Sequence, residues 1–188
     1  YEPSRLTVSG GRLTIQTYKG IGFAANNNQI NALGVGIPSS GKLTFETTVI
    51  NPYNGSGSEQ GGIWAGLNDK TFVKLAITGN KVEMRKELND VSSTASASSN
   101  PDHRITATIS GLNTKTVRLR LVVDLITNKM EGFYSTDGIN YVNAGASYAT
   151  AAIDIASMSL TGKPLYAGLY ATHRNASTPV SFTFDNFS

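Results

Sequence analysis

The sequence predicts an all-β fold, a two-sheet antiparallel β-sandwich, and three observations support this. Apolar and polar residues alternate in short segments from one end of the chain to the other. Glycine, asparagine, proline and serine separate these segments, as they do in turns between strands. No segment keeps the apolar spacing of a helix for ten residues. We therefore expect negligible helix.

The predicted elements are short strands joined by polar turns and two longer loops. Residues 20–41 are rich in glycine and asparagine, and we expect them to form a long loop. Residues 89–103 have the serine and alanine composition of a mobile surface loop. Strands are expected at residues 6–8, 13–15, 43–50, 60–67, 71–77, 81–87, 104–109, 117–124, 129–135, 141–142, 165–172 and 180–187. The fourth, fifth and sixth of these should form a meander, because only short turns separate them.

The composition is that of a single domain. At 188 residues, with 39% hydrophobic residues, the chain can bury one core, and no apolar run approaches the ~20 residues that span a bilayer. The first residues lack an initiator methionine and the pattern of an export signal. We therefore expect residues 1–188 to be a monomeric module of a larger bacterial protein, secreted or at the cell surface, with covalently linked neighbouring domains.

The charged and metal-binding residues exclude several functions. The chain has no cysteine and only two histidines, which excludes a disulfide framework and leaves too few ligands for a zinc or iron site. Although the net charge is +3, the 16 basic residues are scattered rather than clustered. We therefore expect no nucleic-acid partner.

Alternation sorts the residues of each predicted strand into a core face and an outer face. In the strand at 60–67, the alternate residues Ile63 and Ala65 are apolar, so Trp64 lies off the core. The same reasoning applies to the strands that we expect beside it. If these strands share a sheet, its outer face carries Gln60, Trp64, Lys74, Glu83, Arg85, Tyr166 and Tyr170.

This outer set has the chemistry of a sugar-binding groove. The apolar face of a sugar ring packs on an aromatic ring, and its hydroxyls pair with fixed planar groups such as those of Arg, Glu and Gln. Gly62, Gly66 and Gly168 leave room between these side chains. A single Trp or Tyr on a sheet surface can equally be packed beneath a loop, but three aromatic residues together favour a ligand groove. We add His173, close after Tyr170, to the candidate ligand residues.

Arg118 and Arg120 leave the charge of the ligand open. Both alternate with apolar residues in the strand at 117–124 and point away from the core. In the same sheet as Trp64 they would make the groove strongly basic, which favours an acidic glycan such as a uronate or sulfated polymer. In the opposite sheet, the placement that we favour, they belong to a solvated face.

Six segments, in their order along the chain, resemble a known family of domains. They are similar to concanavalin A-like jelly-roll domains of bacterial carbohydrate-active and surface proteins, and above all to the sandwich at the C-terminus of family 43 xylosidases. The resemblance implies a jelly-roll fold. It implies the ligand less directly, since this fold occurs in lectins, glycosidases, lyases and adhesion modules. The segments are residues 59–67, 72–75, 82–85, 119–124, 133–138 and 182–187.

The sequence favours a binding protein over an enzyme. Glycosidases with the concanavalin A-like fold that this chain resembles carry Glu-x-Asp-x-Glu or Glu-x-Asp-x-x-Glu on one strand. In these enzymes the carboxylates act as acid and nucleophile. This chain has neither pattern. Its nearest pair, Glu83 and Glu87, has Arg85 between them, which would lower a carboxyl pKa where an acid needs it raised. We therefore expect a non-catalytic carbohydrate-binding module that recognises a polysaccharide.

Two other functions stay open. The chain could be an adhesion or spacer domain of a large surface protein, acting through its loops. It could also be a polysaccharide lyase of jelly-roll fold, in which a Tyr or His acts as base and an Arg or Gln neutralises a uronate. The residues available for that chemistry are Tyr170, His173, Arg85 and Gln60.

The resemblance also implies one structural calcium ion. Jelly-roll modules hold calcium away from the sugar site, with ligands from the two chain ends and from backbone carbonyls. Asp185, in the ending Phe-Asp-Asn-Phe, is the position that matches, and Glu2 near the other chain end is the second candidate ligand. Asp185 can equally cap a turn.

Overall fold

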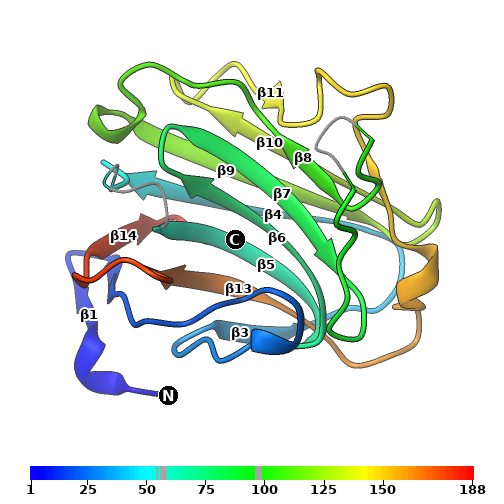
Figure 1. Ribbon diagram of the computed structural model, residues 1–188, viewed down its shortest axis with the longest axis horizontal. Coiled ribbons are helices and arrows are strands. Elements are labelled where there is room, and N and C mark those ends of the chain that lie inside the picture. Colours follow the sequence, from blue (N-terminus) through cyan, green and yellow to red (C-terminus); the bar gives the residue numbers. More distant parts are fainter. Residues whose placement is uncertain (54, 56–58, 96–98) are drawn as a thin grey trace.

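The chain folds into two facing antiparallel sheets (Figure 1). The computed structural model describes residues 1–53, 55, 59–95 and 99–188. Within these ranges the helices are single 3₁₀ turns, and none of them could cross a membrane. These turns are η1 (Pro3–Arg5), η2 (Ala24–Asn26), η3 (Leu112–Thr114) and η4 (Ala156–Met158). The strands are β1 (Leu6–Ser9), β2 (Arg12–Gln16), β3 (Leu33–Ile37), β4 (Lys42–Ile50), β5 (Gln60–Asn68), β6 (Thr71–Thr78), β7 (Lys81–Glu87), β8 (His103–Ile105), β9 (Thr116–Asp124), β10 (Lys129–Ser135), β11 (Val142–Asn143), β12 (Ile153–Asp154), β13 (Leu165–Thr172) and β14 (Ser181–Asp185).

The two sheets differ in size and in the part of the chain that forms them. Sheet A has eight strands, in the order β1-β2-β14-β4-β9-β10-β11, with β12 also paired to β10. Sheet B has six strands, in the order β3-β13-β5-β6-β7-β8, and contains the predicted meander. Every strand pair in both sheets is antiparallel. The predicted two-sheet antiparallel sandwich is confirmed.

The loop expected at residues 20–41 contains a strand, which corrects the sequence prediction. β3 forms one edge of sheet B and pairs with β13, with Gly34 opposite Gly168 and Leu33 opposite Leu169. Glycine lowers the strand propensity of this segment, so its composition indicates a loop. Backbone pairing with a strand more than a hundred residues away stabilises it. The strand expected at 104–109 is also shorter, and sequence analysis missed β12.

The core lies between the sheets, as alternation predicts. Ile63 and Leu75 of sheet B and Leu121 and Phe182 of sheet A are all buried to within 1% of their surface. Burying a side chain of this size contributes about 1.5–3 kcal/mol. The hydrophobic core is therefore the main link between the two sheets.

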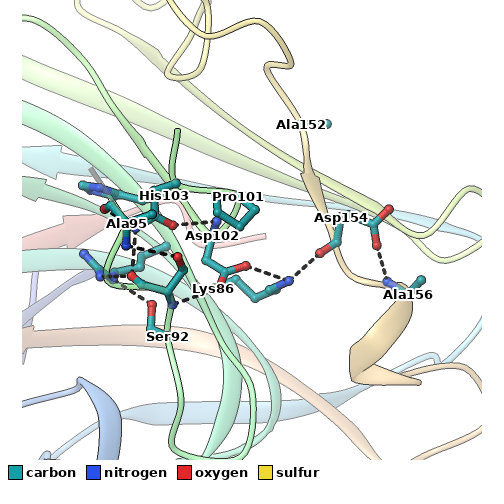
Figure 2. Close-up of polar contacts among 12 residues, drawn as sticks. Lys86, Ser92, Ala95, Pro101, Asp102, His103, Ala152, Asp154 and Ala156 are labelled. Atoms are coloured by element: carbon teal, nitrogen blue, oxygen red, sulfur yellow. Dashed lines mark hydrogen bonds and ion pairs between the residues drawn. The ribbon is translucent and has the colours of Figure 1, made fainter. Parts of the chain in front are cut away.

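The described part of the loop at 89–103 is held by polar contacts at the edge of sheet B, and residues 96–98 lie outside the described residues. Figure 2 shows Lys86 between Asp102 and Asp154. Its Nζ lies 2.8 Å from Asp102 Oδ1 and donates to the backbone carbonyl of Asp154 at 3.0 Å. The second carboxylate oxygen of Asp102 accepts from the backbone N–H of Ser93 at 3.0 Å. The composition of the loop did not reveal this attachment. The mobility of the loop stays a prediction.

Candidate functional site

The face of sheet B that points away from the core carries the predicted groove residues in rows. Cross-strand pairing places Trp64 opposite Lys74, and Lys74 opposite Arg85. Tyr170 and Glu83 lie in the adjacent row of the same face. The expectation that these side chains share one face is confirmed, because β13, β5, β6 and β7 are consecutive strands of one sheet.

The indole of Trp64 extends across β13 and reaches β3. Its Nε1 donates to the backbone carbonyl of Leu33 at 3.0 Å. A Cβ on Gly34 would lie 2.6 Å from Trp64 Cζ2, so the ring packs directly against that glycine. Gly168, the β13 residue opposite Trp64, has no side chain in the path of the indole. The glycines of β13 and β3 thus allow Trp64 to lie along the sheet.

Much of this face is covered by a segment that we call the strap, residues 18–32. In Figure 1 it is the blue segment that follows the first hairpin and runs across sheet B. The strap contacts the sheet through backbone groups, the side-chain amides of Asn27 and Gln29, and one aromatic ring. The contacts join Gly22 O to Lys74 Nζ (3.0 Å), the Ala24 N–H to the Glu87 carboxylate (2.5 Å) and the Phe23 ring to the Arg85 guanidinium (4.5 Å).

The sequence predicted a groove that includes all of these side chains, and this prediction is wrong because most of the predicted groove is covered. Gln60, Lys74, Glu83 and Tyr170 are only 2, 5, 9 and 4% exposed. They point away from the core, but the strap and the neighbouring loop lie over them. Alternation predicts which face of a sheet a side chain takes, and it does not predict what covers that face.

A hydrogen-bonded network joins the covered polar groups. Lys74 Nζ donates to Gln60 Oε1 at 3.2 Å, and Gln60 Nε2 donates to Glu83 at 3.1 Å. Glu83 also lies 2.8 Å from His103 Nε2 and 3.8 Å from Arg85. Burial lowers the pKa of Lys74. Burial alone would raise the pKa of Glu83, but the hydrogen bond with His103 and the nearby positive charges lower it to about 2.

Acid should destabilise the fold through Glu83. Its pKa of about 2 in the folded protein lies below its ordinary value of 4.5. The stabilisation is thus fully present above pH 4.5 and is lost as the pH falls from 4.5 towards about 2. Urea denaturation between about pH 6 and pH 3 should record a falling free energy of unfolding, and Glu83→Gln should make that fall shallower.

Glu87 provides the control for this prediction, because burial raises its pKa. A raised carboxyl pKa makes acid favour the folded state at that residue, so Glu87→Gln should make the fall steeper. If Glu83→Gln and the parent protein lost stability equally with acid, the contribution of Glu83 would be refuted.

Beside Trp64 the strap leaves a cleft of about 330 Å³. Trp64, Phe72 and Tyr170 line it from the sheet, and Asn27 and Gln29 line it from the strap. The lining is mainly apolar. Such a cleft suits a small ligand or ring with an apolar face and a few hydroxyl groups.

Only part of the predicted ligand set reaches this cleft, and the prediction missed most of the other residues that line it. Trp64, Lys74 and Tyr170 line the cleft. Gln60, Glu83 and Arg85 belong to the covered network beside it. Sequence analysis missed Asn27 and Gln29, because the polar composition of the strap was the only signal that they could reach a ligand.

Tyr166 and His173 lie away from the cleft. Tyr166 is on the same face of sheet B and is 41% exposed, but it does not line the cleft. His173 was assigned to the groove, and this is corrected: three residues after Tyr170, alternation turns it to the other face. Its Nδ1 lies 2.9 Å from the Thr17 hydroxyl, and burial lowers its pKa. His173 therefore has a structural role.

Arg118 and Arg120 lie on β9, in sheet A, as the favoured interpretation expected. The Arg120 guanidinium lies over the Tyr141 ring at 3.7 Å and pairs with Glu46. Arg118 donates to the backbone carbonyl of Gly138 at 3.1 Å. These two charges are thus separated from the cleft by the core and cannot determine the charge of its ligand.

Glu2 and Asp185, the two candidate calcium ligands, do not come together. Asp185 lies 3.4 Å from Arg12, at the turn of the first hairpin, whereas Glu2 precedes the other end of that hairpin and lies 2.7 Å from Arg5. No cluster of three or more acidic, His or Cys residues occurs in the part of the chain that the structure describes. The structure therefore does not bring Glu2 and Asp185 together as a pair of ligands, and one calcium ion near Asp185 stays a prediction.

Comparison with known proteins finds matches of fold but none of sequence. No protein-family model and no curated protein matches the chain. A functionally unknown protein from Saccharomyces cerevisiae matches 100% of this chain over 91% of its own, at 16% identity and a TM-score of 0.67. The xylan β-1,4-xylosidase from Bacillus halodurans C-125 matches 98% of this chain, at 16% identity and a TM-score of 0.67. The endo-1,3-β-glucanase from Streptomyces sioyaensis matches 98% of this chain over 77% of its own length, at 14% identity and a TM-score of 0.51.

These matches establish the fold alone, since identities of this size carry no function. The chain spans 34% of the length of the xylosidase, so it corresponds to one part of that protein. The resemblance to concanavalin A-like domains and to the sandwich of family 43 enzymes is confirmed at the level of the fold.

Proposed function

We propose that this chain binds a polysaccharide in the cleft beside Trp64 and does not cleave it. The observation that carries the proposal is the aromatic lining, in which Trp64, Phe72 and Tyr170 meet at a cleft of about 330 Å³. That volume is at the lower end of the roughly 300–1,000 Å³ of small-ligand pockets. Aromatic rings are also the surfaces on which sugar rings pack.

The comparisons support a carbohydrate ligand without identifying it. Two of the matching proteins are, by name, a xylan β-1,4-xylosidase and an endo-1,3-β-glucanase. A fold of this kind occurs in proteins with many functions, so the proposal of a carbohydrate ligand rests mainly on the cleft, and the fold adds support to it. A polymeric ligand also fits a place in a secreted or surface protein, which we propose for the parent of this domain.

The absence of cleavage is supported by the acids around the cleft. Glycoside hydrolysis needs two carboxyl groups across the bond, whereas Asp69 is the one acid among the described residues that line the cleft. Glu83 and Glu87 are engaged by His103 and by the strap. A lyase is disfavoured as well, because burial raises the pKa of the Tyr170 hydroxyl and opposes its use as a base.

Affinity gel electrophoresis tests this proposal. We expect at least one gel among those that contain xylan, xyloglucan or β-1,3-glucan to retard the protein relative to an inert protein of similar size. Neither new reducing ends nor the absorbance of unsaturated products should appear during long incubation. Unretarded migration on every neutral and acidic polymer would instead identify a spacer or adhesion domain, and unsaturated products from polygalacturonate would identify a lyase.

A further inference from the structure

The cleft beside Trp64 ends at the strap and does not continue across sheet B. Gly22 lies over Lys74, to which it is bonded at 3.0 Å, and Phe23 lies over the Arg85 guanidinium at 4.5 Å. Beyond this line Glu83 and Glu87 are buried, and Arg85 is half-buried. A polymer chain therefore has no open path from Trp64 towards β7 and β8.

The turn after β5 and the first residue of the chain also line the cleft. They contribute Asn68 and Asp69 at that turn, and Tyr1, which is 82% exposed. The backbone next to Tyr1 is fixed to the strap, because Glu2 and Asn31 exchange two hydrogen bonds of 2.8 and 2.9 Å. The cleft therefore has one closed end, at the strap.

The charges at the cleft are balanced. Lys74 supplies a cation, but its ammonium group already donates to Gly22 and to Gln60. The acidic residue Asp69 also lines the cleft, and no arginine is among the described lining residues. An acidic sugar would thus lack the bidentate partner that carboxylates and sulfates favour.

Three neutral polar atoms of the lining residues have no hydrogen-bond partner in the described structure. They are the Tyr170 hydroxyl, Asn27 Oδ1 and Gln29 Oε1. The orientation of both amides is fixed, because Asn27 Nδ2 donates to the carbonyl of Asp69 and Gln29 Nε2 donates to that of Ala171. Their oxygens therefore stay acceptors, which suit hydroxyl donors and repel anions. Buried polar atoms are rarely left unpaired, so these three point to a hydroxylated ligand.

We propose that the cleft binds the terminal one or two units of a neutral glycan chain, and not an internal stretch of it. This inference rests on the proposed function and specifies its ligand. The closed end of the cleft excludes a chain that passes through. A terminal unit also has one more free hydroxyl than an internal unit, and hydroxyls match the unpaired acceptors of Asn27 and Gln29.

Calorimetric titration with chains of different length tests the proposal. The probes are linear β-1,4-xylan, β-1,3-glucan, β-1,4-mannan and β-1,4-galactan, each as a long and a short fraction of known mean length, with polygalacturonate as the acidic probe. For end binding, a fraction about ten times shorter offers about ten times as many sites per gram at an unchanged Kd. Polygalacturonate should not bind.

Each other result has a distinct meaning. Sites per gram that do not change with chain length would overturn end binding while leaving the proposed function intact. Tighter binding of polygalacturonate than of any neutral chain would overturn the neutral ligand. Binding of no polymer, neutral or acidic, would overturn this inference and the proposed function together.

Tyr170→Phe tests the hydroxyl without removing the ring. Affinity for the bound glycan should fall about three- to tenfold. The melting temperature should stay the same or rise, because the hydroxyl has no partner in the described protein. Tyr141→Phe is the matched control, since the Tyr141 hydroxyl bonds to Glu46 on sheet A, and its affinity should equal that of the parent. Parental affinity in Tyr170→Phe would refute the role of the hydroxyl.

Discussion

Gly168→Ala should destabilise the protein strongly, because position 168 has no room for a methyl group. A Cβ there would lie 1.7 Å from the backbone oxygen of Leu33 and 2.7 Å from the Cα of Gly34. Both atoms belong to the backbone of β3, which cannot turn aside as a side chain would. We expect the free energy of unfolding, measured by urea denaturation, to fall by about 3 kcal/mol or more as β3 is pushed away from β13.

Gly36→Ala, on the neighbouring strand β3, is the matched control. No atom lies within 4 Å of a Cβ built on Gly36. The same change of residue should therefore leave the stability of the protein within about 0.5 kcal/mol of the parent, or raise it slightly by restricting the unfolded chain. An equal loss of stability in the two variants would contradict the steric argument.

Gly168→Ala should also weaken glycan binding, because β3 holds the main aromatic residue of the cleft. The carbonyl of Leu33 accepts from Trp64 Nε1, and Leu33 itself lines the cleft. A displaced β3 would release the indole from its position. Weakened binding in this variant and parental binding in Gly36→Ala would link the edge strand to the site.

The strands and their faces could be predicted because the information is local. In the segment at 60–67, alternation of Ile63 and Ala65 with Trp64 determines which side chains enter the core, and the burial of both apolar residues follows. Apart from the meander, the order of strands in each sheet was not predicted. No property of a single segment states that β13 lies between β3 and β5.

The cover over the predicted groove could not be predicted, because it depends on contacts between distant segments. The strap has the glycine and asparagine content of a solvent-exposed loop. Its attachment consists of contacts with distant strands, such as the bond from Lys74 Nζ to the backbone carbonyl of Gly22, about fifty residues earlier in the chain. Polar residues on the outer face, such as Gln60 and Glu83, favoured an open groove in the sequence, yet they bond to each other beneath the strap.

The proposed metal ligands failed for a similar reason. Glu2 and Asp185 lie near the two chain ends, which the resemblance implied as the source of calcium ligands. In the structure each acid pairs with a nearby arginine, Glu2 with Arg5 and Asp185 with Arg12. A pattern of acids in a sequence does not reveal which cation balances them.

Trp64→Ala should reduce glycan affinity about tenfold or more, which corresponds to at least about 1.4 kcal/mol. Trp64 is the largest aromatic side chain of the cleft and supplies the surface on which a sugar ring would pack. The structure adds a cost in stability that an exposed aromatic residue would not have. The indole packs on Gly34 and donates to Leu33, so its loss should destabilise the fold by about 1–3 kcal/mol.

Two further variants separate loss of the site from loss of the fold. Trp64→Phe keeps an aromatic surface but loses the bond to Leu33, so it should lose stability yet retain more affinity than Trp64→Ala. Tyr166→Ala removes an aromatic ring from the same face of sheet B, outside the cleft, and should bind as the parent does. Calorimetric titration of all three below their melting temperatures distinguishes the cases. If Tyr166→Ala lost as much affinity as Trp64→Ala, the glycan would lie along the exposed edge of sheet B, and the cleft beneath the strap would not be the binding site.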